Sequence, residues 1–114
     1  MEDHKTSFEI FKQTGEGYQF LLKAHSGKTL LEGNVYNKKE HAIQDIDMVK
    51  KNAAKSDRYE RKTSKDGFFF FHLKTPDGKI IASSEKYASE SGMENGINSI
   101  KRYAPFSNLK EFLQ

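Results

Sequence analysis

The chain has 114 residues, of which 35% are hydrophobic and 31% are charged, and it carries nine Phe and five Tyr. This length and apolar content predict one small globular domain over residues 1–114 and exclude a disordered chain. There is no Cys, which excludes disulfides and thiolate chemistry, and the net charge of +3 is too small to identify an anionic partner.

No segment of the sequence has the features of a secretion signal or a membrane span. The first ten residues, MEDHKTSFEI, are polar and lack the apolar centre of a signal peptide. The longest run of large apolar residues is the four phenylalanines at 68–71, far below the about 20 residues that cross a bilayer. We therefore expect a cytoplasmic protein that does not interact with membranes.

An internal repeat decides the expected architecture. An offset of 51 residues aligns residues 8–53 with residues 59–104 without a gap. Identical residues occupy ten of the aligned pairs: Glu9/Glu60, Phe20/Phe71, Leu22/Leu73, Lys23/Lys74, Gly27/Gly78, Lys28/Lys79, Tyr36/Tyr87, Ile46/Ile97, Lys50/Lys101 and Ala53/Ala104. Such self-similarity is typical of one supersecondary unit used twice, and it leaves residues 105–114 as a C-terminal tail.

Each unit is expected to begin with two strands. The segments FEIFK (8–12) and YERKT (59–63) open with an aromatic residue and lead into the polar, glycine-bearing turns TGEG and SKDG. In the second strand apolar residues take every other position, namely Tyr18, Phe20 and Leu22 in the first unit and Phe69, Phe71 and Leu73 in the second.

A hairpin, a third strand and a helix complete each unit. Gly27 and Gly78 stand where a tight hairpin requires positive φ, before expected strands at 29–31 and 80–82. Asn37 and Ser89 are the expected helix N-caps. The helices are predicted from two apolar stripes of helical spacing: Ala42, Ile46, Val49 and Ala53, and Met93, Ile97, Ile100 and Ala104.

Together these patterns predict an α+β fold of two tandem β-β-β-α units. The strands are expected to form one antiparallel sheet with both helices on one face, and the units to be related by a pseudo-two-fold axis. The tail, FSNLKEFLQ, has apolar residues at 106, 109, 112 and 113, which favours a helical turn capped by Ser107. This turn could dock on its own domain or on a second chain.

The second unit resembles the YegP-like family of small uncharacterised prokaryotic proteins. The resemblance lies in GKIIASSEKYASESGMENGINSIKRYAP, which follows GFFFFHLKTPD. It spans roughly residues 8–105 and is looser in the first unit, where LEGNVYNKKEHAIQDID departs from the serine, glutamate and asparagine-glycine pattern of the family. The resemblance implies two β(3)-α units in one sheet. It leaves open whether the segments after the helices are exchanged between the two halves, and it comes with no assigned activity.

Two glycines in the second helix are the first candidate site. Gly92 and Gly96 lie four residues apart, although each costs a helix about 1 kcal/mol relative to alanine. The aligned residues of the first unit are His41 and Asp45. We interpret the glycines as a close-packing notch, and a groove for a small ligand is the alternative.

No catalytic, metal or cofactor site is expected. Ser84 and Glu85 are adjacent, but no histidine lies nearby to serve as an oriented base. The histidines show no HExxH or other close ligand spacing. The interpretation that follows is a non-enzymatic structural or protein-interaction module.

The second candidate site is an aromatic sheet face. If Phe69 and Phe71 point to the helices, then Phe68, Phe70 and His72 belong to the opposite face. Either neighbouring strands shelter these side chains, or they form an interaction face for a protein partner or a second copy of the chain.

A less favoured alternative is weak binding of single-stranded nucleic acid. Lys50, Lys51, Arg61 and Lys62 would form a basic rim beside the aromatic face. Glu60 interrupts this basic cluster and no RNP-like aromatic motif is present, so nucleic acid ranks below a protein partner.

Overall fold

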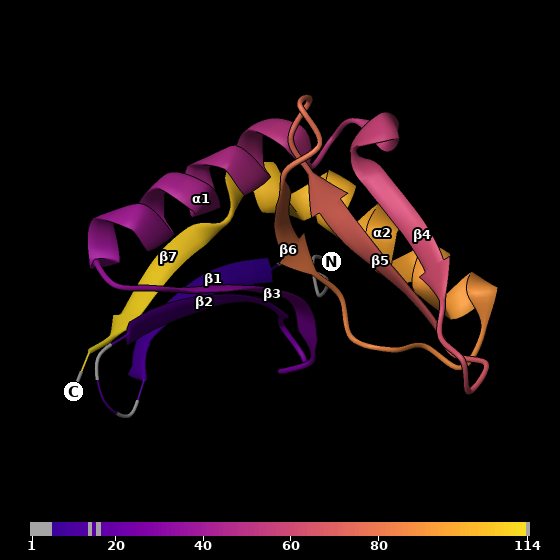
Figure 1. The fold of residues 1–114 in the computed structure, drawn as a ribbon, viewed down its shortest axis with the longest axis horizontal. Helices are drawn as coiled ribbons and strands as arrows, with labels where there is room; N and C mark the ends of the chain where they lie inside the picture. Colours follow the sequence, from indigo (N-terminus) through magenta and orange to yellow (C-terminus); the bar gives the residue numbers. More distant parts are fainter. Residues whose placement is uncertain (1–5, 14, 16, 114) are drawn as a thin grey trace.

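The computed structural model describes residues 6–13, 15 and 17–113, which form a seven-stranded sheet and two α-helices (Figure 1). The elements follow in the order β1 (Thr6–Gln13), β2 (Gly17–Ala24), β3 (Thr29–Tyr36), α1 (Lys39–Asn52), η1 (Ser56–Arg58), β4 (Tyr59–Thr63), β5 (Phe69–Lys74), β6 (Ile80–Ser83), α2 (Glu90–Tyr103), η2 (Ala104–Phe106) and β7 (Asn108–Phe112). Every predicted strand and helix of the two units is present, and the third strands run on to Tyr36 and Ser83.

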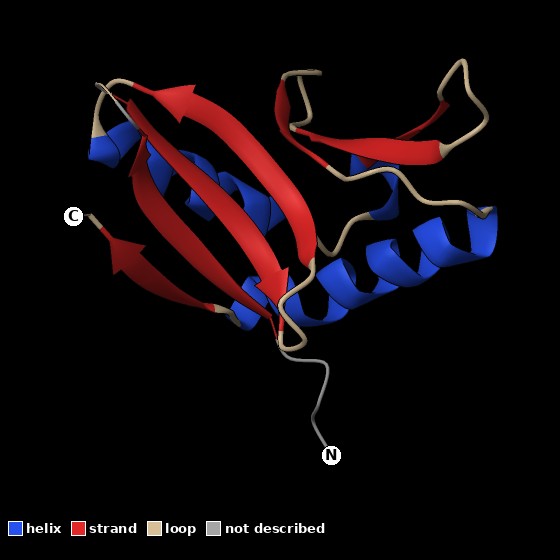
Figure 2. Cartoon of the chain, turned by 90° about the horizontal axis from the view of Figure 1, so that it is seen from below, coloured by secondary structure: helices blue, strands red, loops and turns tan. Residues whose placement is uncertain are grey.

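The sheet has the order β4-β5-β6-β3-β2-β1-β7. The first unit (residues 8–53) and the second unit (residues 59–104) meet where β3 pairs with β6, with Glu32 opposite Ser83 and Gly33 opposite Ala82. Figure 2 shows the two groups of strands running in different directions, as the right-handed twist of a continuous sheet requires. The two units therefore share one backbone hydrogen-bond network.

The C-terminal tail corrects two predictions. Residues 108–112 form a strand and not a helical turn, and β7 pairs in parallel with β1, with Leu109 opposite Phe8. The sheet is therefore mixed, whereas the sequence predicted an antiparallel one. The apolar residues at helical spacing do not form one buried edge, because Phe106 is 84% exposed and Phe112 is 52% exposed. An extended tail instead satisfies the free backbone groups of β1 and packs Leu109 against the core.

The core contains the same aromatic arrangement twice. Phe20 contacts Phe8 edge-to-face at 6.3 Å and stacks on Tyr36 at 6.3 Å between ring centroids. At the aligned positions, Phe71 contacts Tyr59 at 5.6 Å and stacks on Tyr87 at 6.5 Å. The strand registers also agree, since Phe8 lies opposite Leu22 and Tyr59 opposite Leu73. Five of these six rings belong to one hydrophobic cluster, and the sixth, Tyr36, packs against it.

The two helices present their predicted stripes to this cluster, and all eight stripe residues are buried. Ser89 caps α2 as expected, because its Oγ accepts a 3.0 Å hydrogen bond from the backbone N–H of Gly92. The N-cap predicted at Asn37 is wrong: the residue before α1 is Lys38, and it makes no side-chain cap. α1 packs on β2 and β3 of its own unit and on β5 and β6 of the other, so it covers the junction (Figure 1).

Gly33 lies at the junction of the two units and faces the Phe20 ring. A Cβ at this position would lie 2.5 Å from the Cδ2 and Cζ atoms of Phe20. The ring is fully buried, so it has no free space into which it could move away from an added methyl group. Only glycine allows the β3 backbone to approach the ring this closely.

We predict that Gly33→Ala destabilises the fold by about 2 kcal/mol, because it overpacks the fully buried Phe20 ring. Urea unfolding followed by circular dichroism would measure the loss. The matched control is Phe20→Leu combined with Gly33→Ala: the smaller side chain makes room, so the two changes should cost less together than the sum of their separate effects. Additive costs would contradict the packing explanation.

Candidate functional site

The glycine notch of α2 is filled by a side chain of the same unit. A Cβ on Gly96 would lie 3.0 Å from Cζ of Tyr87 and closer still to its hydroxyl oxygen, and one on Gly92 would lie 3.6 Å from the ring. Tyr87 comes from the segment between β6 and α2 and is 6% exposed. The missing side chains therefore make room for a phenol ring.

The hydroxyl groups of the two aligned tyrosines have different surroundings. Tyr36 donates a hydrogen bond to the Oδ2 of Asp45, which is 7% exposed. Burial, together with this carboxylate, raises the pKa of Tyr36. At the aligned positions Tyr87 faces Gly96, and its buried hydroxyl has no hydrogen-bond partner within the described part of the chain. Burial and the charge of Glu85 raise the pKa of Tyr87, so it remains protonated at neutral pH.

Two pockets lie where the hairpin of one unit meets the helix of the other. The first, which we call the Tyr87 pocket, has a volume of about 290 Å³ and is lined by Ala24, Lys28, Leu30, Tyr87, Gly92, Asn95, Gly96 and Ser99. The second, the Asp45 pocket, has a volume of about 420 Å³ and is lined by Asp45, Met48, Thr75, Pro76, Asp77, Lys79 and Ile81. Several lining residues correspond in the repeat, among them Lys28 to Lys79, Leu30 to Ile81 and Gly96 to Asp45.

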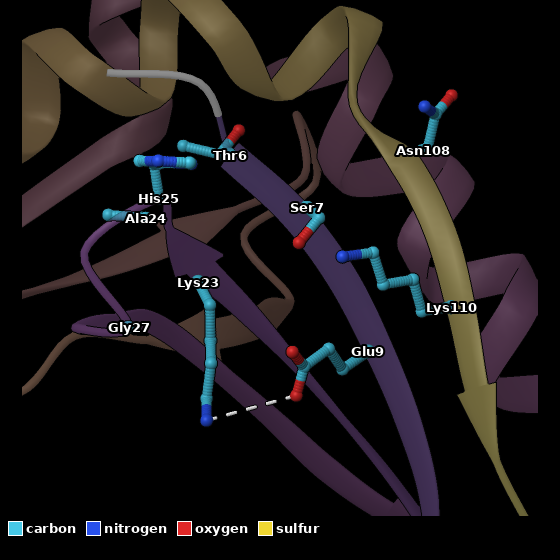
Figure 3. A pocket seen from close by; sticks show the side chains of 9 residues that line it. All are labelled: Thr6, Ser7, Glu9, Lys23, Ala24, His25, Gly27, Asn108 and Lys110. Carbon is cyan, nitrogen blue, oxygen red and sulfur yellow. Dashed lines mark ion pairs between the residues drawn. The ribbon is translucent and has the colours of Figure 1, made fainter. Parts of the chain in front are cut away.

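A third recess lies on the outer side of β1, β2 and β7 (Figure 3). Its volume is about 360 Å³, and its lining residues are Thr6, Ser7, Glu9, Lys23, Ala24, His25, Gly27, Asn108 and Lys110. Lys23 and Glu9 pair with each other at 3.8 Å. The recess is a polar surface with an exposed imidazole at His25, and no lining side chain in it is both buried and unpaired.

The predicted aromatic face is only partly exposed. Phe70 contacts His72 edge-to-face at 5.6 Å, and the Nδ1 of His72 lies 2.8 Å from the Oγ of Ser83. Phe68 precedes β5, is 38% exposed, and has the ammonium of Lys86 5.9 Å from its ring centroid. The face is therefore a small patch at one end of the sheet. Burial lowers the pKa of His72 below its ordinary value.

The predicted basic rim is divided between two faces. Arg61 points toward α2 and donates hydrogen bonds of 2.5 and 3.0 Å to the carboxylate of Glu94, which hold the pKa of Glu94 below its usual range. Lys62 is next to Arg61 on β4 and so points to the opposite face. The Lys50 ammonium lies 5.7 Å from the Phe8 ring on the helix side. The four cations do not form one continuous surface.

Ser84 and Glu85 have structural contacts. The Oγ of Ser84 accepts a 3.0 Å hydrogen bond from the N–H of Phe71 and donates one of 2.8 Å to the carbonyl of Glu85. Among the described residues, no group of three or more potential ligands could hold a metal ion. Within those same residues, no helix is both long enough and apolar enough to cross a membrane.

Both units match one family of proteins. Residues 14–60 and 64–111 each match a domain of unknown function, DUF1508. The chain belongs to the DUF1508 family. Each match runs from the turn before the second strand of a unit to the segment after its helix, which supports the repeat read from the sequence.

Relatives of this DUF1508 protein are similar along most of their length. The chain is 36% identical over 105 residues to a UPF0339 protein in the ptx operon 5' region of Stutzerimonas stutzeri, covering 92% of this chain and 95% of the relative. It is 36% identical over 104 residues to the UPF0339 protein YegP of Escherichia coli K12, covering 91% and 94%. None of these names refers to an activity or a ligand.

Two solution structures have the same fold. The structure of YegP from E. coli, a protein of unknown function, has a TM-score of 0.89 at 34% identity and covers 96% of this chain and 95% of its own. A UPF0339 protein from Shewanella oneidensis has a TM-score of 0.90 at 28% identity and covers 96% and 92%. The small α+β fold with one sheet and two helices is thus shared by these relatives.

The tyrosine hydroxyls were not singled out from the sequence, although the signal was present. The repeat aligns Tyr36 with Tyr87 and Asp45 with Gly96. The alignment cannot show that Tyr36 contacts Asp45, because the two residues lie on different elements. Once this contact is known, the glycine at position 96, aligned with Asp45, shows that Tyr87 has no corresponding acceptor.

We predict that the two tyrosines respond differently to loss of the hydroxyl. Tyr36→Phe should cost about 2 kcal/mol, because the buried carboxylate of Asp45 loses its donor. Tyr87→Phe should be neutral to within about 0.5 kcal/mol or slightly stabilising, because its hydroxyl has no partner to lose. Urea unfolding of the pair provides the measurement, and each variant is the other's matched control. Equal costs would contradict the assigned difference between the sites.

We also predict that His72 gives the protein a stability that depends on pH. The pKa of its imidazole is lowered from the ordinary 6.5, so the unfolded chain binds more protons in this range. Stability should be full above the ordinary pKa and should fall as the pH drops through it toward the lower folded-state pKa. His72→Gln should reduce this slope, measured as the urea midpoint against pH. His25→Gln, at an exposed ring, is the control that should retain it.

Proposed function

We propose that this DUF1508 protein is a non-enzymatic, cytoplasmic protein-interaction module whose β4 edge pairs with an extended segment of a partner protein. The observation that supports this is the position of β7. The tail of the chain binds in parallel along β1, and β4 is the strand of the second unit that corresponds to β1. Among the described strands β4 ends the sheet, so its outer backbone groups have no strand beside them.

The proposal treats the two units as related by a pseudo-two-fold axis with both helices on one face. Equal strand registers and the repeated aromatic contacts support this equivalence. Further support comes from the two pockets, in which the hairpin of each unit packs against the helix of the other. An interaction made on β1 is then a guide to what β4 can bind.

The backbone of β4 offers hydrogen-bond donors at its outer edge. In the β4–β5 hairpin the N–H of Ser64 donates to the carbonyl of Phe68, while Phe69 exchanges both of its bonds with Tyr87. Because an antiparallel strand alternates the direction of its polar groups, Lys62 bonds toward β5, and the N–H groups of Arg61 and Thr63 point away from the sheet. An added strand can pair with them, as in β-strand addition.

The side chains around this edge suggest the composition of the added segment. Leu109 of β7 packs beside Phe8, so an apolar residue is expected beside the corresponding Tyr59. On the outer face Lys62 lies opposite Phe70 in the adjoining strand and has no ion pair among the described residues. An acidic or aromatic residue of the partner would contact Lys62 and Phe70. Since Phe70 belongs to the aromatic face with Phe68 and His72, that face adjoins the proposed site.

Nucleic acid remains the weaker alternative. Neutralising several phosphates needs cations that follow one backbone path, and Arg61 is already paired with Glu94 on the helix side. The surface around β4 therefore favours a polypeptide over a polyanion.

The chain itself provides the probe. We predict that a peptide with the sequence of residues 105–114, PFSNLKEFLQ, binds in trans and perturbs the amide NMR signals of residues 59–63 in a labelled sample. Thr63→Pro should abolish these changes, because it removes an outward N–H and places a ring at the edge. Thr63→Val is the matched control and should bind normally, since it keeps the N–H.

A second peptide tests the side-chain part of the proposal. Replacing the leucine that corresponds to Leu109 by aspartate should weaken binding about tenfold or more, because it places a charge beside Tyr59. Peptide binding that is unaffected by both changes, or that perturbs only β1, would contradict the assignment of β4. No binding at any accessible concentration would overturn it.

A further inference from the structure

The free edge of β4 carries opposite charges at alternate positions of its outer face. Glu60 and Lys62 lie on this face, on either side of Arg61, which points to α2. Among the described strands none lies beyond β4 (Figure 1). Lys62 has no ion pair in the described part of the chain, whereas Glu60 pairs at 3.4 Å with Lys74 of the adjoining β5. The outer side of both charges is therefore open to a further strand.

The backbone groups at this edge allow strand pairing. The hydrogen bonds of the β4–β5 hairpin direct the N–H groups of Arg61 and Thr63 outward, together with the carbonyls of Tyr59 and Arg61. The N–H of Tyr59 is occupied, because it donates to the carbonyl of Ser56. The edge thus offers donors and acceptors at alternate residues, which is the spacing that an antiparallel partner needs.

From these observations we infer that two copies of the chain pair through β4, in an antiparallel arrangement with a two-fold axis at Arg61. The pairing rests on the proposed function, since it makes a second copy the partner of the same edge. Arg61 of each copy exchanges both backbone hydrogen bonds with Arg61 of the other. The N–H of Thr63 in each copy donates to the carbonyl of Tyr59 in the other. The two-fold axis makes the contact self-complementary and closed.

The charges of the outer face select this register. Glu60 of each copy lies opposite Lys62 of the other, in a non-hydrogen-bonded pair whose Cα atoms approach to about 4.5 Å. Shifting the register by two residues in either direction would place Glu60 opposite Glu60 or Lys62 opposite Lys62. Like charges directly opposite each other destabilise a strand pair, and opposite charges stabilise it. The alternation of Glu and Lys is therefore complementary to itself in one register.

The neighbouring side chains are compatible with the pairing. Each Arg61 guanidinium donates hydrogen bonds of 2.5 and 3.0 Å to Glu94 of its own α2, so its charge is neutralised within its own copy. On the outer face Phe70 of β5 lies opposite Lys62. The Lys62 ammonium then lies between this ring and Glu60 of the second copy, which supplies the acidic residue that the edge lacks.

Sedimentation equilibrium at protein concentrations from about 10 µM to about 1 mM tests the dimer. We expect the mass to rise with concentration toward that of two chains. The peptide PFSNLKEFLQ should reverse the rise, because it competes for the same edge. In a mixture of labelled and unlabelled copies, an NOE should connect the Hα of Glu60 in one copy with the Hα of Lys62 in the other, as a non-hydrogen-bonded pair requires.

Charge variants assign the contact. Glu60→Lys and Lys62→Glu should each weaken the dimer at least about tenfold, because each replaces both attractive pairs by repulsive ones. An equimolar mixture of the two variants should associate again, and a chain that carries both changes should also dimerise. Glu40→Lys, at an exposed position in the first turn of α1, changes the net charge equally and should leave the dimer intact. Urea unfolding shows whether each variant is folded.

Three outcomes would contradict the β4 dimer. A chain that stays monomeric at every concentration would show that Lys62 keeps the edge from pairing. If the tail peptide still bound β4 in that case, the proposed function would stand without the dimer, whereas loss of both would remove both. A dimer that Glu60→Lys and Lys62→Glu leave unchanged would place the interface elsewhere. An NOE that joins Glu60 to Glu60 would exclude the register.

Discussion

The pairing of β3 with β6 is the contact on which the rest of the structure depends. It joins two three-stranded units into one sheet through two opposed pairs, Glu32 with Ser83 and Gly33 with Ala82. The same place is also where Phe20 packs against the β3 backbone, which excludes any side chain at Gly33. Because the junction is closed by both hydrogen bonds and packing, α1 can lie across strands of both units. One core, and not two, results.

The two units differ in the partner of their aligned tyrosine and in the strand that lies along their outer edge. In the first unit the helix supplies a carboxylate to its tyrosine, and β1 holds the tail of the chain. In the second unit the helix has a glycine, and β4 pairs with β5 on one side but has no described strand along its outer edge. The first unit thus satisfies within the chain two kinds of group that have no described partner in the second unit. A duplicated fold gives this comparison within one molecule, because the satisfied copy shows what the other copy lacks.

Much of the fold could be predicted because its signals are local. The alternation of Phe69, Phe71 and Leu73 and the helical stripe ending at Ala104 are set by which side of an element is buried. Gly27 and Gly78 have φ of 94° and 91°, as the tight hairpins require. The glycine notch could be located but not its occupant, because Tyr87 reaches Gly96 from outside the helix. The tail was predicted wrongly because its four apolar residues have helical spacing, although only Leu109 and Leu113 pack against the core and Phe106 and Phe112 are exposed.

By itself the sequence determined the repeat, the type and order of the elements within each unit, and the residues of the core, since these follow from periodicity and turn chemistry along short stretches. Only the tertiary structure decided which strand edges meet, where the tail binds, and which tyrosine hydroxyl has an acceptor. These depend on backbone and side-chain groups far apart in the chain, such as β1 with β7 or Lys28 with Tyr87. Contacts between such distant groups leave no periodic trace in a sequence, and any extended segment offers the same backbone donors and acceptors for strand pairing.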